Sequence, residues 1–221
     1  MTDLPSTHHP RLRQRRKMLR RFATMHPVFV YIVEAPSPAD IFDDRTEGSA
    51  LSESLKIAGR PHALRTAVNI DQFRRALALD PTEGGVGAEM ERRNGAYPLL
   101  HFSMHGNSDG IVLTSGEFLL WADLIREILP LNEVVPAGLH IGMSSCHGFS
   151  AASEKMHSGQ KPPYAVLGTP ELLPWSDGLI AFSTFYHHWF KGDTSIEETL
   201  TAVRLASGHS GFELAGWKEE G

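Results

Sequence analysis

The amino-acid sequence predicts an α/β fold with a mainly parallel central sheet. Residues 28–33 form a continuous run of apolar, β-branched and aromatic side chains, which is typical of a strand buried on both faces of such a sheet. Segments with helical spacing separate this run from later apolar runs, as strand–helix–strand crossovers require. With 221 residues, 41% of them hydrophobic, the chain can bury one substantial core. We expect a three-layer α/β/α sandwich.

The first half of the chain divides into strands, helices and loops at clear signals. Gly59 and Pro61 end one predicted helix, and Asp71 is the expected N-cap of the next. Residues 82–95 contain four glycines and predict a mobile loop that could line a substrate groove. In order, the expected segments are a strand at 28–33, a Pro- and Asp-rich loop at 36–44, a helix through Leu51, Leu55 and Ala58, a short strand at 63–70 and a helix at 71–81.

Two short motifs, each a strand that ends in a reactive side chain, supply the candidate chemistry. Residues 99–106 end in His105 and Gly106, and residues 140–148 contain Cys146, 41 positions after His105. The intervening segment predicts a crossover, so the two strands should be parallel neighbours. Because ligands bind outside the carboxyl ends of strands in open α/β sheets, we expect His105 and Cys146 to share one site.

A histidine beside a cysteine is suited to nucleophilic catalysis. A thiol becomes a strong nucleophile when an imidazole takes its proton or stabilises its thiolate. The backbone amides of Gly106 and Cys146 are our candidates for an oxyanion hole. The alternatives are a buried cysteine that acts only as a small hydrophobe and a core histidine with satisfied nitrogens. We expect His147 to point away from Cys146 in a structural role, and His101 to be a core or sheet-face histidine.

The remaining elements lie between the two motifs and after them. The helical stripe after the hairpin should end at Pro130, and Ser195 with Glu198 forms a capping-box signature. In order, we expect a hairpin at 111–113 and 117–119, a helix at 120–129, a strand at 165–168, a helix beginning near Ser176 and Asp177, and a last helix from Ser195 to Gly208.

The two motifs resemble those of the caspase-like cysteine peptidases, and more closely their bacterial CHAT branch. The matching residues are His105-Gly106 and Ser145-Cys146-His147-Gly148, and residues 165–169 and 185–192 resemble later parts of the same domain. The resemblance covers residues 97–207 well and residues 28–80 only as a pattern of elements. It implies a caspase-like fold and a cysteine endopeptidase, a thiol protease with catalytic His105 and Cys146 that needs no cofactor.

The resemblance also implies partners. Bacterial relatives of this kind belong to antiviral defence or cell-death systems, so we expect a specific protein substrate such as a pore-forming or other autoinhibited effector, and an upstream sensor protein. The alternative is a catalytically silent caspase-like scaffold or regulatory binding module, and a third possibility is another Cys/His hydrolase or acyltransferase.

The residue that selects the substrate is less clearly marked. Relatives that cut after Arg or Lys often carry Asp two residues before the cysteine, where this chain has Ser144; the Gln found in relatives that cut after Asp is also missing. In CHAT-like relatives an acid beyond the strand at 165–168 can serve instead, so Asp177, together with Ser144, is a candidate substrate-binding residue. The competing role for Asp177 or Ser176 is the N-cap of the following helix. Asp40, Asp43, Asp44 and Glu47 resemble the calcium-binding acids of some metacaspases, but we expect a solvated loop there.

Charge and cysteine content limit the remaining classes of function. Residues 1–21 carry seven basic side chains and one acid, so the rest of the chain has a formal balance of −11. We expect a basic N-terminal extension at 1–25 and a single peptidase domain at 26–221. The extension is open to a nucleic-acid or membrane contact or to proteolysis, but a solvated arm is favoured and nucleic acid is not an expected partner. The single cysteine and the lack of a membrane-spanning run or a signal-peptide core predict a cytoplasmic protein. The histidine spacings are unlike those of a zinc signature, so we expect no metal site.

Overall fold

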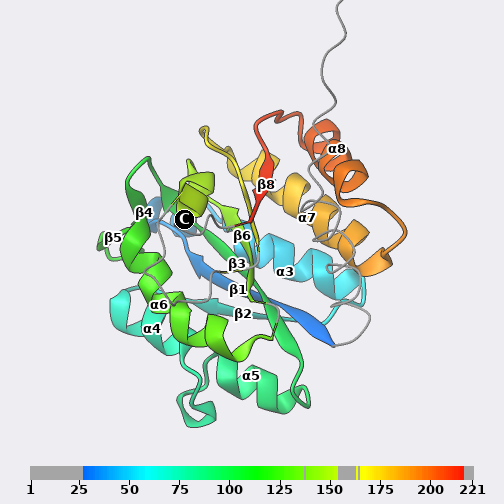
Figure 1. Cartoon of the computed structure of the whole chain (residues 1–221). Coiled ribbons are helices and arrows are strands. Elements are labelled where there is room, and N and C mark those ends of the chain that lie inside the picture. Colours follow the sequence, from blue (N-terminus) through cyan, green and yellow to red (C-terminus); the bar gives the residue numbers. More distant parts are fainter. Residues whose placement is uncertain (1–26, 137, 154–162, 164, 217–221) are drawn as a thin grey trace, which may run out of the picture.

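The computed structural model describes residues 27–136, 138–153, 163 and 165–216, and these form an α/β structure with helices on both faces of a mixed, mostly parallel sheet (Figure 1). This confirms the α/β class and agrees with a three-layer α/β/α arrangement. No helix in the described ranges is long and apolar enough to cross a membrane. The expected basic extension at 1–25 lies outside the described residues.

The central sheet has the strand order β2-β1-β3-β6-β7-β8. The first five of these strands run parallel to one another, and β8 pairs antiparallel with β7. The hairpin strands β4 and β5 extend from the end of β3. The strands are β1 (Val28–Ala35), β2 (His62–Thr66), β3 (Tyr97–Gly106), β4 (Gly110–Val112), β5 (Phe118–Leu120), β6 (His140–Ser144), β7 (Ala165–Gly168) and β8 (Glu213–Ala215).

Two hydrophobic clusters, one on each face of the sheet, hold the helices in place. Side chains of α4, α5 and α6 form one cluster with the sheet, and side chains of α3, α7 and α8 form the other (Figure 1). The helices are α2 (Pro38–Phe42), α3 (Glu47–Ile57), α4 (Ile70–Leu77), α5 (Val86–Arg92), α6 (Trp121–Val134), α7 (Trp175–Lys191) and α8 (Ile196–Ser207), with short 3-10 turns η1 (Pro81–Glu83) and η2 (Gly148–Ser153).

The register of the sheet decides which side chains share a face. Glu34, Ser103 and Ser144 are paired in one row across β1, β3 and β6. Because side chains alternate along a strand, His101 and His105 lie on the same face of β3 as Ser103. The ring of His101 packs against Phe182 of α7 with centroids 4.6 Å apart, so this is the face that α7 covers.

Most helix and strand boundaries agree with those expected from the sequence, and the differences have physical reasons. Asn69, not Asp71, caps α4, because its side chain accepts a hydrogen bond from the Gln72 amide. Pro130 does not end α6, which continues to Val134 because the next turn buries Leu131 and Asn132 in the fold. The predicted capping box of α8 is confirmed. Strand β8 has no counterpart in the sequence prediction.

The glycine-rich span 82–95 is packed rather than an open loop. It contains η1, α5 and the buried Val86. A Cβ atom on Gly85 would lie 2.2 Å from the carbonyl oxygen of Arg75, and one on Gly87 would lie 2.0 Å from that of Leu79. These glycines therefore allow two backbone segments to approach closely, and the prediction of a mobile loop at 82–95 was wrong.

Candidate active site

The strands that carry His105 and Cys146 are parallel neighbours, as predicted. Ser103 of β3 pairs with Ser144 of β6, so each candidate lies two residues beyond a paired position. Both therefore lie at the carboxyl edge of the sheet, where α/β folds bind ligands. His105 is still within β3, whereas Cys146 lies in the turn that follows β6.

The segment before and at the start of α7 contacts both candidates. The Cys146 sulfur accepts a hydrogen bond from the Leu173 amide at 3.3 Å and lies 3.9 Å from the Leu173 carbonyl oxygen. Trp175, two residues later, packs its ring against His105 with centroids 5.0 Å apart. Cys146 and His105 thus both contact the short segment of residues 173–175. Within the described residues no hydrogen bond joins them directly, and such contacts are often long before substrate binds.

Asp40 completes the arrangement, and the sequence analysis missed it. Its Oδ2 lies 2.6 Å from Nε2 of His105 and accepts hydrogen bonds from the Ser37 hydroxyl at 2.6 Å and the Ser37 amide at 3.1 Å. Its Oδ1 accepts from the Trp175 indole at 3.3 Å. The carboxylate therefore fixes one side of the imidazole.

The environment of Asp40 keeps its carboxyl group ionised. Burial acts to raise the pKa of Asp40, but the hydrogen bonds from Ser37 and His105 outweigh it and lower the pKa from 3.8 to about 2. An ionised carboxylate only accepts hydrogen bonds, so Nε2 of His105 must be the donor. In the neutral ring Nδ1 is then the unprotonated, basic nitrogen.

A signal for this position was present in the sequence. Ser37-Pro38 followed by Asp40 is a capping-box pattern with proline at the first helical position, and the structure forms this box at the start of α2. The pattern marks a helix start, but nothing local says that Asp40 also meets His105, 65 residues away.

The four acidic residues Asp40, Asp43, Asp44 and Glu47 do not form the expected solvated loop, because they differ in burial. Asp43 and Asp44 are exposed, whereas Asp40 and Glu47 are buried. Glu47 lies at the start of α3 with its Oε2 3.5 Å from Nε2 of the buried His101. The described residues contain no group of three or more His, Cys, Asp or Glu side chains placed to hold a metal ion.

Gly106 lies against the backbone of the cysteine turn. A Cβ atom at this position would lie 2.8 Å from the Cys146 carbonyl oxygen and 3.3 Å from Cβ of Ser145. Only glycine fits here without a shift of the backbone. This closeness brings the two candidate oxyanion residues together, and the direction of their amides in a substrate complex stays a prediction.

His147 takes part in the turn through its backbone. It has a left-handed conformation with φ of 56°, which is uncommon for a residue other than glycine. Its amide donates a hydrogen bond to the Glu171 carbonyl oxygen at 2.8 Å. The turn that presents Cys146 is therefore tied to the segment before α7.

Of the two candidate substrate-binding residues, Ser144 lies against Gly178 of α7, the residue that follows Asp177. Ser144 is fully buried, and a Cβ atom on Gly178 would lie 2.8 Å from its hydroxyl oxygen. Asp177 lies in the first turn of α7 and accepts a hydrogen bond from the Ser176 hydroxyl at 3.0 Å. The N-cap is Pro174, so the alternative that Asp177 or Ser176 caps the helix was wrong.

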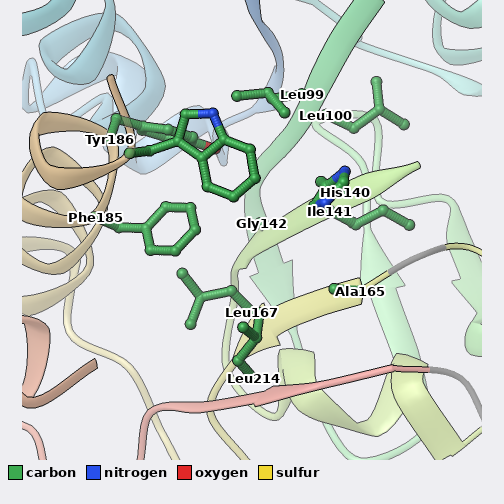
Figure 2. A pocket seen from close by; sticks show the side chains of 11 residues that line it. Leu99, Leu100, His140, Ile141, Gly142, Ala165, Leu167, Phe185, Tyr186 and Leu214 are labelled. Carbon is green, nitrogen blue, oxygen red and sulfur yellow. The ribbon is translucent and has the colours of Figure 1, made fainter. Parts of the chain in front are cut away.

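An apolar cavity lies against the sheet under α7, but it is far along the strands from the candidate site. Figure 2 shows it lined by Leu99 and His140, which lie near the beginnings of β3 and β6. Its volume is about 20 Å³, room for about one water molecule. Burial lowers the pKa of His140 to about 3, so this ring stays neutral. The cavity is part of the core and does not receive a substrate.

Comparison of the sequence with protein-family models and with curated proteins gives no match. The geometry of His105, Cys146 and Asp40 is therefore the basis for any chemical role of this chain.

Proposed function

We propose that this protein is a cysteine endopeptidase of the caspase-like type. The observation that carries the proposal is the 2.6 Å contact between Asp40 and His105 at the edge where the next strand delivers Cys146. A histidine held by an ionised carboxylate, at the same sheet edge as a half-buried thiol, is an arrangement that can activate a nucleophile.

The proposed reaction proceeds in two stages. Nδ1 of His105 takes the proton of Cys146, and the sulfur adds to the carbonyl carbon of the scissile peptide bond. The amides of Gly106 and Cys146 stabilise the negative oxygen. The C–N bond then breaks as His105 returns the proton to the leaving amine, which gives a thioester. Water, deprotonated by His105, hydrolyses the thioester and restores the thiol. Asp40 acts as a positioning residue that also stabilises the imidazolium.

The substrate in this proposal is a specific protein. From the resemblance of the two motifs we propose an autoinhibited effector, such as a pore-forming protein, in a bacterial antiviral or cell-death response triggered by a sensor protein. The single cysteine supports a reducing, cytoplasmic location. No cofactor enters the chemistry.

A peptide library that varies the residue before the scissile bond tests the proposal. We expect the purified protein to cut with a clear preference at that position, measured by mass spectrometry of the products. An acyltransferase would instead turn over only esters and thioesters. A silent scaffold would cut nothing and would not form a covalent adduct on Cys146 with a peptidyl ketone inhibitor.

The position of Asp177 leads to a prediction about specificity. We expect a preference for Arg or Lys before the cut, and we expect Asp177→Ala to lower turnover of those substrates by roughly tenfold or more, because a charge-assisted contact is lost. The loss of stability should be about 1 kcal/mol or less, since Asp177 acts on α7 through the helix dipole and one exposed hydrogen bond from Ser176. Ser176→Ala, which removes the hydroxyl that contacts Asp177, is the control and should keep the preference. An Asp177→Ala variant with unchanged preference would place the specificity pocket elsewhere.

A further inference from the structure

A second polar hollow lies at the outer edge of the sheet, away from the candidate active site. It has a volume of about 270 Å³ and is lined by residues at the end of β2, on α4 and in η1. Strand β1 separates β2 from β3, which carries His105. The hollow is therefore a site of its own, and it is at the carboxyl end of a parallel strand, as ligand sites in α/β folds are.

Two arginines are held in this hollow by consecutive backbone carbonyls. Nε of Arg75 donates to the Glu83 carbonyl oxygen at 2.7 Å, and Nε of Arg65 donates to that of Gly84 at 3.0 Å. The turn that supplies these carbonyls is itself fixed, because Gly85 packs directly on the backbone of α4. The two guanidinium groups are thus placed before any ligand arrives.

The hollow contains hydrogen-bond donors that the protein does not use. Among the described residues, the terminal nitrogens of Arg75 have no hydrogen-bond partner. The two terminal nitrogens of Arg65 each donate one hydrogen bond, the first to the Leu64 carbonyl oxygen and the second to Glu89, so each nitrogen keeps one unused N–H. Gln72 uses its side-chain oxygen to accept from the Val68 amide, so its NH₂ group remains free to donate.

The local charge also favours an anion. One carboxylate, Glu89, is shared by Arg65, Arg92 and Arg93, so it neutralises only part of their charge. Glu83 is the one acid among the residues that line the hollow. The hollow is thus lined by two arginines and one acid, whereas the chain outside the basic extension has a formal balance of −11.

We propose that this hollow binds a small phosphate-bearing anion. Two fixed guanidinium groups offer donors in several directions, which matches the three or four oxygens of a phosphoryl group better than the two of a carboxylate. The volume is below that of pockets for drug-sized ligands and suits one or two phosphoryl groups. Arg75 is the main ligand, with support from Arg65 and Gln72.

Isothermal titration calorimetry of the full chain with inorganic pyrophosphate at low ionic strength tests this site. We expect Arg75→Gln to weaken binding by roughly tenfold or more, because it removes charge-assisted hydrogen bonds. The matched control is Arg126→Gln, which removes the same charge from an exposed arginine paired with Asp123 on α6. That variant should bind pyrophosphate like the wild type.

A third variant changes the affinity in the opposite direction. Glu83→Gln removes the acid from the hollow and should strengthen pyrophosphate binding several-fold, since a like charge no longer opposes the ligand. The proposal is wrong if the wild type shows no binding below about 1 mM. It is equally wrong if Arg75→Gln and Arg126→Gln weaken binding alike, or if Glu83→Gln weakens it. None of these outcomes depends on peptidase activity.

Discussion

Replacement of Cys146 by Ala should abolish peptide cleavage. The sulfur is the only thiol in the chain, and loss of a nucleophile in a comparable catalytic group lowers kcat by on the order of 10⁴-fold or more. The fold should survive, because the side chain is half-buried and its sulfur contacts only the backbone of Leu173 among its hydrogen-bond partners. We expect the melting temperature to fall by no more than about 4 °C. Cleavage of the preferred library peptide and a thermal melt measure the two effects.

Two further variants make this result specific. His105→Ala should lower kcat by roughly 10²-fold to 10⁴-fold, as loss of a general base does. Ser145→Ala removes the neighbouring hydroxyl, which is buried without a hydrogen-bond partner, and should retain cleavage. Cleavage by purified Cys146→Ala protein would place the catalytic group elsewhere, and equal loss of activity in Ser145→Ala would indicate damage to the turn rather than to the chemistry.

The sequence predicted the parts of the site that depend on the ends of strands. His105 and Cys146 each follow an apolar run, and parallel strands present their carboxyl ends at one edge, so strand pairing alone was enough to place both residues at the same edge of the sheet. The capping box at Ser195 was predicted for a similar reason, since both of its partners lie within one turn. Patterns whose geometry is fixed by the local sequence can be interpreted before the fold is known.

The parts that were missed depend on contacts between distant segments. Asp40 meets His105 and Trp175 only after α2 packs beside the start of α7, 135 residues later. The same holds for Gly85 and Gly87. Their close backbone contacts require glycine, and several glycines in a short stretch are also the usual pattern of a loop. In both cases the residue type was visible, but its partner was set by tertiary packing.

The second large effect is expected for Asp40→Asn. The change keeps the size of the side chain but removes the charge that accepts the Nε2 proton of His105 at 2.6 Å. Nε2 can then lose its proton and leave Nδ1 protonated, which is the wrong tautomer to accept the thiol proton. In a catalytic triad this substitution lowers kcat by about 10⁴-fold. We expect a fall of 10²-fold to 10⁴-fold in kcat with little change in KM, because Asp40 positions the base and does not hold substrate.

The same variant should alter the acid stability of the protein. The pKa of Asp40 in the folded state, about 2, is below its ordinary 3.8, so the ionised group stabilises the fold above about pH 4 and this contribution is lost as the pH falls from 3.8 towards 2. The difference in unfolding free energy between wild type and Asp40→Asn should therefore shrink over that window, as measured by denaturant titration at each pH. Asp123→Asn, which removes an exposed charge paired with Arg126 on α6, is the control and should change neither kcat nor this pH dependence. If Asp40→Asn keeps kcat within a few-fold of wild type, the carboxylate only anchors α2, and His105 acts with Cys146 as a dyad.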